Sequence, residues 1–236
     1  MTVKIGSARI DESGKASGGR AGDQTGKEVS IQDWYRHGKG WRVLRCSDSA
    51  KAEKIATAME AACANGNIGY DQSERLTLYN RAKEVGFDPA KVKTPCETDC
   101  SALVRVCLAY AGIKTDNFIT SNEAKAILNT GLFTELTDKK YTDRPDYLLR
   151  GDILVTAAKG HTAVVLSDGD KAEKAGVAIT GRRVNLRCGN GTNYAVLKTV
   201  SAGECFEYVA TAENGWLAVV DGDRVVWVSG KYGVRG

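Results

Sequence analysis

The spacing of hydrophobic residues changes along this chain from the period of a helix to the period of a strand. Between residues 47 and 131, apolar side chains recur on one helical face, as Ile55, Met59 and Ala62 do. From Asp152 onward, short apolar runs are separated by turn residues. Helices followed by strands indicate an α+β domain rather than a regular alternation of strands and helices.

Capping residues and glycines set the limits of the expected elements. A helix that starts near residue 100 stops at Gly112, and another ends before Gly131. Two short strands should follow, joined by a turn at Lys159 and Gly160. Including their caps, the expected helices cover residues 50–65, 71–86, 100–111 and 120–130, and the strands cover residues 152–156 and 161–166.

The last quarter of the chain has its own pattern. Residues 168–181 are rich in Gly, Ala, Lys and Asp and are typical of a strand end and a linker. From Arg182 onward, short strands alternate with turns, which predicts a small all-β domain. We therefore expect a domain over residues 1–170, a linker over 171–181 and a second domain over 182–236.

Charge and hydropathy exclude several classes of protein. The net charge of +4 and the pI near 8.6 fall short of a nucleic-acid binder, and no run of Lys and Arg is present. No apolar run is long enough to span a membrane, and the first residues lack the apolar core of a signal peptide. We expect a protein made in the cytoplasm, with no nucleic-acid or membrane partner.

The seven cysteines favour neither disulfides nor a metal site. Their number is odd and the chain is not small, so a disulfide framework is not expected. Cys96, Cys100 and Cys107 lack paired zinc-ligand spacing, and only two histidines are present. We expect no metal and no cofactor, and most of the thiols should be small buried side chains.

Cys100 differs from the other cysteines because it stands in the first turn of an expected amphipathic helix. Free N–H groups and the helix dipole favour a thiolate there, so the position predicts an activated nucleophile. Its base should be a histidine, and His161 opens a strand after a glycine turn, on a rigid element. We favour His161 over His37, which lies in a polar, Gly-rich stretch and is expected at the surface. Most helical cysteines are core residues, which is the ordinary alternative for Cys100.

Three sequence blocks carry a family resemblance. Residues 99–104 (DCSALV), 151–155 (GDILV) and 160–165 (GHTAVV) occur in the order and spacing of the NlpC/P60 family of papain-like peptidoglycan hydrolases, to which the CHAP family is related. This resemblance implies a papain-like α+β catalytic domain with Cys100 and His161 as its catalytic pair. It also implies that Tyr70, Asp99 and Ser101 line the pocket for the stem peptide.

The chain departs from that family pattern after the histidine strand, where a third polar residue is expected. The segment that follows His161 already looks like linker. Asp168 is the favoured orienting residue for His161, with Glu173, or Asp23 or Gln24 from the N-terminal loop, as alternatives. That Gly-rich loop lies outside the family core, and its glycines permit tight turns over another surface or a substrate-facing loop. With this loop upstream of the catalytic blocks, the arrangement resembles lysins encoded by phages of Gram-positive bacteria.

The C-terminal segment resembles a bacterial SH3-type domain. The resemblance rests on residues 184–192 (VNLRCGNGT), on Gly215 with Trp216, and on residues 226–228 (VWV). Such a domain implies binding to cell-wall peptides or glycans. Trp216 is the candidate binding residue, and at least half of Tyr194, Tyr208, Trp216 and Trp227 should instead belong to the core of a small barrel.

Together these features predict an endolysin that hydrolyses an amide bond of the stem peptide in Gram-positive peptidoglycan. The endopeptidase is favoured, and an N-acetylmuramoyl-L-alanine amidase with the same cysteine and histidine is the alternative. Proteins of two other classes remain possible: a non-catalytic wall-binding protein and an intracellular thiol enzyme. A phage lysin that is released through a membrane hole needs no signal peptide. A bacterial protein made without a leader also fits this sequence.

Overall fold

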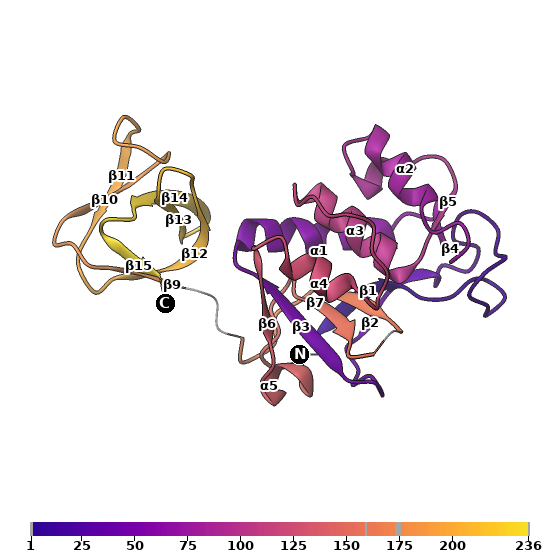
Figure 1. Cartoon of the computed structure of the whole chain (residues 1–236). Helices are drawn as coiled ribbons and strands as arrows, with labels where there is room; N and C mark the ends of the chain where they lie inside the picture. The colour runs from indigo at the N-terminus through magenta and orange to yellow at the C-terminus, as the bar shows by residue number, and fades with distance from the viewer. Residues whose placement is uncertain (1, 159, 173–175, 236) are drawn as a thin grey trace. The chain divides into compact units, whose positions relative to one another are not determined.

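The computed structural model describes residues 2–158, 160–172 and 176–235. The chain divides into two compact units, the first formed by residues 1–47 and 51–172 and the second by residues 48–50 and 173–236. The first unit combines helices with a mainly antiparallel sheet, and the second consists of strands (Figure 1). No helix in the described ranges has both the length and the apolar character needed to cross a membrane.

The main sheet of the first unit has the strand order β2-β1-β8-β7-β3-β6. All of its neighbouring strands pair antiparallel. A separate parallel pair, β4 and β5, leads into the helix that carries Cys100. The strands are β1 (Lys4–Ala8), β2 (Val29–Asp33), β3 (Trp41–Cys46), β4 (Ile68–Tyr70), β5 (Cys96–Thr98), β6 (Phe133–Leu136), β7 (Ile153–Thr156) and β8 (Thr162–Val165).

Helices cover one face of this sheet. Because strand residues alternate between its two faces, their side chains contribute to two separate cores. Val164 and Ile153 meet Met59 and Leu103 in the larger core, whereas Trp41 belongs to a smaller core on the other face. Figure 1 shows α1, α3 and α4 gathered beside β3 and β7. The helices are α1 (Ser49–Cys63), α2 (Thr77–Glu84), the 3₁₀ turn η1 (Pro89–Lys91), α3 (Cys100–Tyr110), α4 (Glu123–Leu128) and α5 (Lys139–Thr142).

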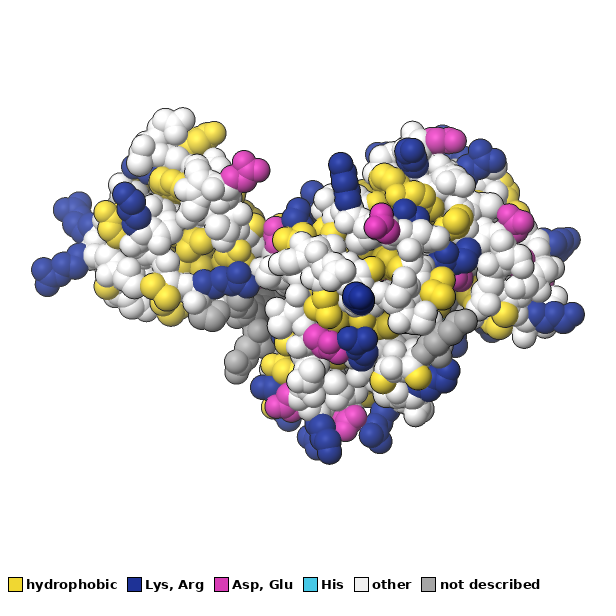
Figure 2. All heavy atoms as spheres, viewed as in Figure 1, with side chains coloured by type: hydrophobic (Ala, Val, Ile, Leu, Met, Phe, Trp, Pro, Cys, Tyr) yellow, Lys and Arg dark blue, Asp and Glu magenta, His cyan; other side chains and the backbone are white. Residues whose placement is uncertain are grey.

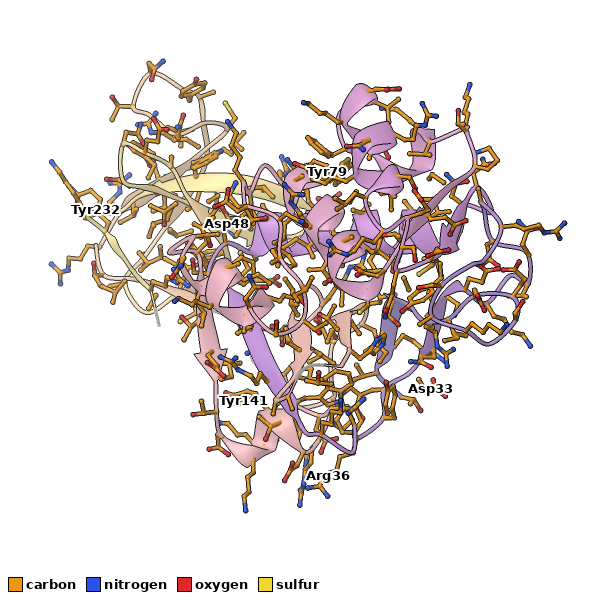
Figure 3. The ribbon with its side chains drawn as sticks, turned by 45° about the vertical axis from the view of Figure 1, so that its right-hand side comes forward. Asp33, Arg36, Asp48, Tyr79, Tyr141 and Tyr232 are labelled. Atoms are coloured by element: carbon orange, nitrogen blue, oxygen red, sulfur yellow. The ribbon has the colours of Figure 1, made fainter. Side chains whose placement is uncertain are left out.

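Helix α2 packs on α3 through a charged side chain as well as apolar ones. The guanidinium of Arg105 lies 3.9 Å from the centroid of the Tyr79 ring, which Figure 3 labels on α2. A cation placed over an aromatic face is attracted by the ring quadrupole, which is negative at that face. Helix α2 begins at Thr77, later than the start expected at residue 71, because the carboxylate of Asp71 caps a turn there and also accepts from the N–H of Gly18.

The N-terminal 45 residues contribute two strands and the start of a third, which corrects the expectation of a loop region. Strand β1 pairs with both β2 and β8 and so lies inside the sheet. The glycine-rich segment between β1 and β2 does pack closely over another surface. A Cβ on Gly69 would stand 2.5 Å from the carbonyl oxygen of Gly22, so only glycine fits that contact.

A buried ion pair joins two neighbouring strands of the sheet. Arg45 on β3 donates two hydrogen bonds to the carboxylate of Asp152, whose side chain is 2% exposed. Arg42, on the same strand, pairs with Glu135 at the surface, where both side chains are about one-third exposed. Both pairs join an arginine to a carboxylate, but one carboxylate is buried and the other is partly exposed.

Replacing Arg45 by alanine should lower the free energy of unfolding by about 3–5 kcal/mol, because Asp152 is left charged and buried without its partner. The Arg42→Ala variant is the matched control and should cost less than about 1 kcal/mol, since water screens its pair. Urea unfolding of both variants measures the difference. Equal losses in the two variants would contradict the assigned role of burial.

Acidic side chains gather beneath the glycine-rich segment. Glu97 is 3% exposed, and neither of its carboxylate oxygens has a hydrogen-bond partner in the described part of the chain. Glu28 is also buried but accepts from the N–H groups of Gln24 and Tyr70. Burial, followed by the charges of Glu28 and Asp71, raises the pKa of Glu97 to about 8.

Stability should therefore depend on pH through Glu97. The folded protein keeps this side chain protonated where the unfolded chain has ionised it, so stability is lost as pH rises from 4.5 to about 8. A Glu97→Gln variant stays neutral and should be more stable than the parent above pH 8 by roughly 1–3 kcal/mol, with little difference near pH 4.5. Urea titrations at both pH values test this, and a gain that does not vary with pH would refute it.

The second unit is a sheet with the strand order β11-β10-β14-β13-β12-β9-β15. Its core includes Val177, Leu186, Val219 and Val228. The predicted linker over residues 171–181 is wrong for its second half, because β9 pairs with both β12 and β15. The strands are β9 (Gly176–Ile179), β10 (Val184–Arg187), β11 (Val196–Val200), β12 (Cys205–Thr211), β13 (Trp216–Asp221), β14 (Arg224–Ser229) and β15 (Gly233–Arg235).

Candidate active site

Cys100 is the first residue of α3, as the sequence predicts. Asp99 caps this helix: its carboxylate accepts a hydrogen bond of 2.7 Å from the N–H of Ala102. An aspartate at this position satisfies one of the N–H groups that have no partner in the first turn. The cap and the preceding strand β5 therefore hold the sulfur at a defined end of the helix.

The sulfur of Cys100 lies where two strands of the sheet separate. The pairing of β1 with β8 ends at Gly6 and Val164. Beyond that point the backbone N–H of Thr162 lies beside the sulfur and lowers the pKa of Cys100, against the larger effect of burial. Thr162 directly follows His161, so the fold brings the two predicted catalytic residues to the same point of the sheet.

His161 stands at the turn between β7 and β8. Its backbone N–H donates to Oγ1 of Thr156, and its carbonyl oxygen accepts from the N–H of the same residue. The Nε2 atom of its ring lies 3.3 Å from Oγ of Ser7 on β1. Lys159, part of the predicted turn, lies outside the described residues.

Aromatic side chains surround the imidazole. The rings of Trp41 and His161 have centroids 6.4 Å apart, and His37 lies 5.1 Å from Trp41 on the same basis. Tyr35 packs against both His37 and Trp41. His37 is thus half-buried beside the site, rather than a surface residue as the sequence suggests.

Both members of the pair are uncharged at neutral pH. Burial, followed by the charge of Asp99, raises the pKa of Cys100 to about 12, although N–H groups of Thr162 and Ser101 oppose this. The prediction of a thiolate at the helix start is therefore wrong. The sulfur is only 6% exposed, and the loss of water around it outweighs the stabilisation of a thiolate by the helix N-terminus. Burial, followed by the charges of His37 and Arg9, lowers the pKa of His161 to about 4.

Asp99 and Ser101 are internal groups, which corrects the expectation that they line a substrate pocket. Ser101 is 1% exposed and Asp99 is 7% exposed. Arg75 pairs with the carboxylate of Asp99 and donates to Oγ of Ser101 and to the carbonyl oxygen of Phe118. These side chains brace the start of α3. Arg75 was missed because the sequence places it in an exposed-looking polar stretch.

Two tyrosines lie near the sulfur. Tyr70 is buried, and its hydroxyl accepts from the side chain of Gln72 at 3.0 Å. Burial raises the pKa of Tyr70 to about 12, with a contribution from the charge of Cys100. Tyr35 is 37% exposed, and its pKa is raised by burial and by Cys100, with Arg9 opposing. Tyr35 is therefore the more accessible of the two and was not identified from the sequence.

A comparison with protein-family models settles the broader identity. The model described as "Endolysin-like domain" matches residues 5–172, which is more than half of the chain and covers nearly all of the first unit. This chain belongs to the endolysin-like domain family. The family places it among endolysin-type enzymes that degrade the bacterial cell wall. A search of curated proteins found no match.

The predicted third residue of this endolysin-like domain is not where it was expected. Asp168 accepts from the backbone N–H of Arg150 and lies seven residues beyond His161, past the opposite end of β8. Because an extended chain rises about 3.3 Å per residue, Asp168 is too distant to orient the imidazole. Ser7 lies beside the imidazole instead. The sequence did not indicate Ser7, because β1 was not expected.

The other candidates for the third residue have different roles. The carboxylate of Asp23 accepts from the N–H groups of Thr25 and Gly26, which closes a turn. The side-chain amide of Gln24 donates to carbonyl oxygens of its own loop. Glu173 lies outside the described residues. In the described ranges, no three His, Cys, Asp or Glu side chains are grouped so that they could hold a metal ion.

The aromatic candidates of the second unit separate into core and surface. Tyr208 is 4% exposed, and its hydroxyl pairs with Thr211, so it belongs to the core. Tyr194 is 43% exposed. Trp216, which begins β13, and Trp227 on β14 are half-buried. Trp216 therefore remains a predicted binding residue of this endolysin-like protein.

Basic side chains are spread over the face of the molecule that Figure 2 presents. On the face that Figure 2 presents, Lys and Arg side chains are scattered between white and yellow surface and form no stripe. Arg36, labelled in Figure 3, lies 3.4 Å from the carboxylate of Asp143.

Proposed function

We propose that this chain is a cysteine-dependent peptidoglycan hydrolase that cleaves an amide bond of the stem peptide in Gram-positive cell walls. The observation that carries the proposal is the placement of Cys100 at the start of α3 beside Thr162, the residue after His161, within an endolysin-like domain. A papain-like catalytic fold accounts for a cysteine at the start of a helix and a histidine on an antiparallel sheet. The second unit then serves as an SH3-type wall-binding domain.

The proposed reaction begins with a neutral pair. With Nε2 beside Ser7, the other ring nitrogen, Nδ1, is available to accept the thiol proton as the sulfur attacks the amide carbonyl. The carbonyl oxygen becomes an oxyanion, which the backbone N–H of Cys100 at the helix start helps to hold. The C–N bond then breaks, the imidazolium gives its proton to the leaving amine, and a thioester remains.

Water completes the cycle. The neutral imidazole takes a proton from water as its oxygen attacks the thioester, and the C–S bond breaks to release a carboxylic acid. The sulfur regains its proton from the imidazolium. Each turnover consumes one amide bond and one water molecule, and it requires no cofactor.

Fragment analysis of digested, purified peptidoglycan tests the bond that is cut. An endopeptidase leaves shortened peptides on the glycan and creates a new amino terminus within the stem. An amidase instead frees the amino group of L-alanine and leaves glycan strands without peptide. The endopeptidase is the proposal, and release of intact stems would replace it by the amidase with the same cysteine and histidine.

Binding to the wall separates the enzyme from a non-catalytic wall protein. The Cys100→Ala variant should sediment with isolated Gram-positive walls as the parent protein does, while it releases no fragments. A Trp216→Ala variant should sediment less and keep its turnover of soluble muropeptides. A parent protein that binds walls but releases no fragments would favour the non-catalytic alternative.

A further inference from the structure

We propose that Glu123 is a neutral, protonated positioning residue that holds Thr162 against the Cys100 sulfur. Glu123 is the first residue of α4 and is 0% exposed. Its Oε1 atom lies 2.8 Å from Oγ1 of Thr162, the residue whose backbone N–H lies beside the sulfur. The inference rests on the proposed role of Cys100 and adds a residue that the sequence placed only within the helix expected from residue 120.

The protonation state follows from counting hydrogens at Thr162. Its hydroxyl lies 2.8 Å from Oε1 of Glu123 and 2.9 Å from the carbonyl oxygen of Leu154. A hydroxyl has one hydrogen to donate, and a backbone carbonyl can only accept. Both contacts are hydrogen bonds only if Thr162 donates to Leu154 and Glu123 donates to Thr162, which requires a proton on Oε1.

The second oxygen of Glu123 agrees with a neutral acid. Oε2 is buried and has no hydrogen-bond partner in the described ranges. An ionised carboxylate in that state would lose its hydration without compensation, whereas the carbonyl oxygen of a neutral acid loses much less. A proton on Glu123 therefore resolves the otherwise unexplained burial of this side chain.

The neighbouring charges act in the same direction. Burial is the largest cause that raises the pKa of Glu123 well above its ordinary value, and the carboxylate of Asp99 adds to it. The charge of Arg75 opposes it, as would a hydrogen bond donated by Thr162 to an ionised Glu123. Arg75 is already paired with Asp99, so it offers Glu123 little compensation.

A neutral Glu123 has two consequences for the reaction. Its hydrogen bond fixes Thr162 at the start of β8. The backbone N–H of Thr162 lies beside the sulfur, and His161 directly precedes it in the chain. It also keeps a negative charge away from a sulfur that must become a thiolate during attack, since an ionised Glu123 raises the pKa of Cys100. The side chain thus supports the thiolate by position and by lacking charge.

Four variants test this, with kcat on soluble muropeptides and the pH dependence of Cys100 alkylation by iodoacetamide as readouts. Glu123→Ala should lower kcat roughly 10- to 100-fold with little change in KM, because the sulfur contact loosens. Thr162→Val should reproduce that loss. Glu123→Gln and Thr162→Ser should rescue most of it, since an amide donates to Thr162 and serine keeps the hydroxyl. Lys125→Ala, on the exposed face of α4, is the matched control.

Infrared spectroscopy reads the proton directly and needs no substrate. The difference between the parent protein and Glu123→Gln should contain the C=O band of a protonated carboxylic acid at neutral pH, even if Glu123→Ala does not fold. Absence of that band, or a marked fall in the alkylation pKa in Glu123→Gln, would overturn the proposal. So would a Glu123→Ala variant with reduced thermal stability but unchanged kcat and alkylation. If Cys100→Ala still lysed walls, the proposed function would fail while the infrared result stood.

Discussion

Replacing Cys100 by alanine abolishes the release of soluble fragments from purified peptidoglycan. The variant loses the only atom that can form the thioester, so the rate should fall by roughly 10⁴-fold or more. Alanine fits the space at the start of α3, and the cap from Asp99 to Ala102 does not involve the sulfur. Folding should therefore survive, and circular dichroism and thermal melting check this.

Cys188→Ala is the matched control for that experiment. Cys188 is also a free cysteine, but it is exposed in the second unit. Its removal should leave the rate within twofold of the parent on the same substrate, a difference of about 0.4 kcal/mol. Turnover that survives in Cys100→Ala and disappears in Cys188→Ala would reject Cys100 as the nucleophile.

The His161→Ala variant shows the second largest loss, roughly 10²- to 10⁴-fold in kcat/KM, because the thiol then has no general base. The burial of Cys100 makes this base essential, since a thiol with a pKa of about 12 has almost no thiolate at neutral pH. The measurement is the rate on soluble muropeptides. A His161→Ala variant with near-normal turnover would mean that the thiol is activated in another way.

The pH profile of the parent enzyme carries the same prediction. The imidazole can accept a proton only when it is neutral, and its pKa in the folded protein is about 4. The value of kcat/KM should therefore fall as pH drops through about 4, not near the ordinary value of 6.5. A profile with its acid limb near 6.5 would show that His161 is hydrated in the working enzyme.

His37→Ala separates the two histidines. The charge of His37 is the second cause, after burial, of the low pKa of His161. The variant should keep most of its turnover, and the acid limb of its pH profile should move upward. If His37→Ala instead abolished turnover and His161→Ala did not, the order of preference between the two histidines would be reversed.

The burial of His161 also makes the stability of the folded protein depend on pH. His161 stays neutral in the folded protein at pH values where the unfolded chain has protonated it. Its contribution to stability is therefore present above pH 6.5 and is lost as pH falls toward about 4. Glu97 has the opposite sign, so the two residues favour the folded state at opposite ends of the pH range.

Local patterns in the sequence determined the helices that position the site and the start of the catalytic helix. Asp99 caps α3 through a hydrogen bond within four residues, and the apolar period of 100–111 marks the same helix. The turn before β8 likewise depends on neighbouring residues. Such features can be predicted because each one is decided by side chains that are close in sequence.

Tertiary structure alone decided which distant side chains complete the site. Ser7 reaches His161 only because β1 pairs with β8, and Glu123 reaches Thr162 only because α4 packs on that sheet. The charge state of Cys100 was also decided at this level. A helix start favours a thiolate, but the amount of water left around the sulfur depends on every segment packed against it, and that quantity is not encoded in any local pattern.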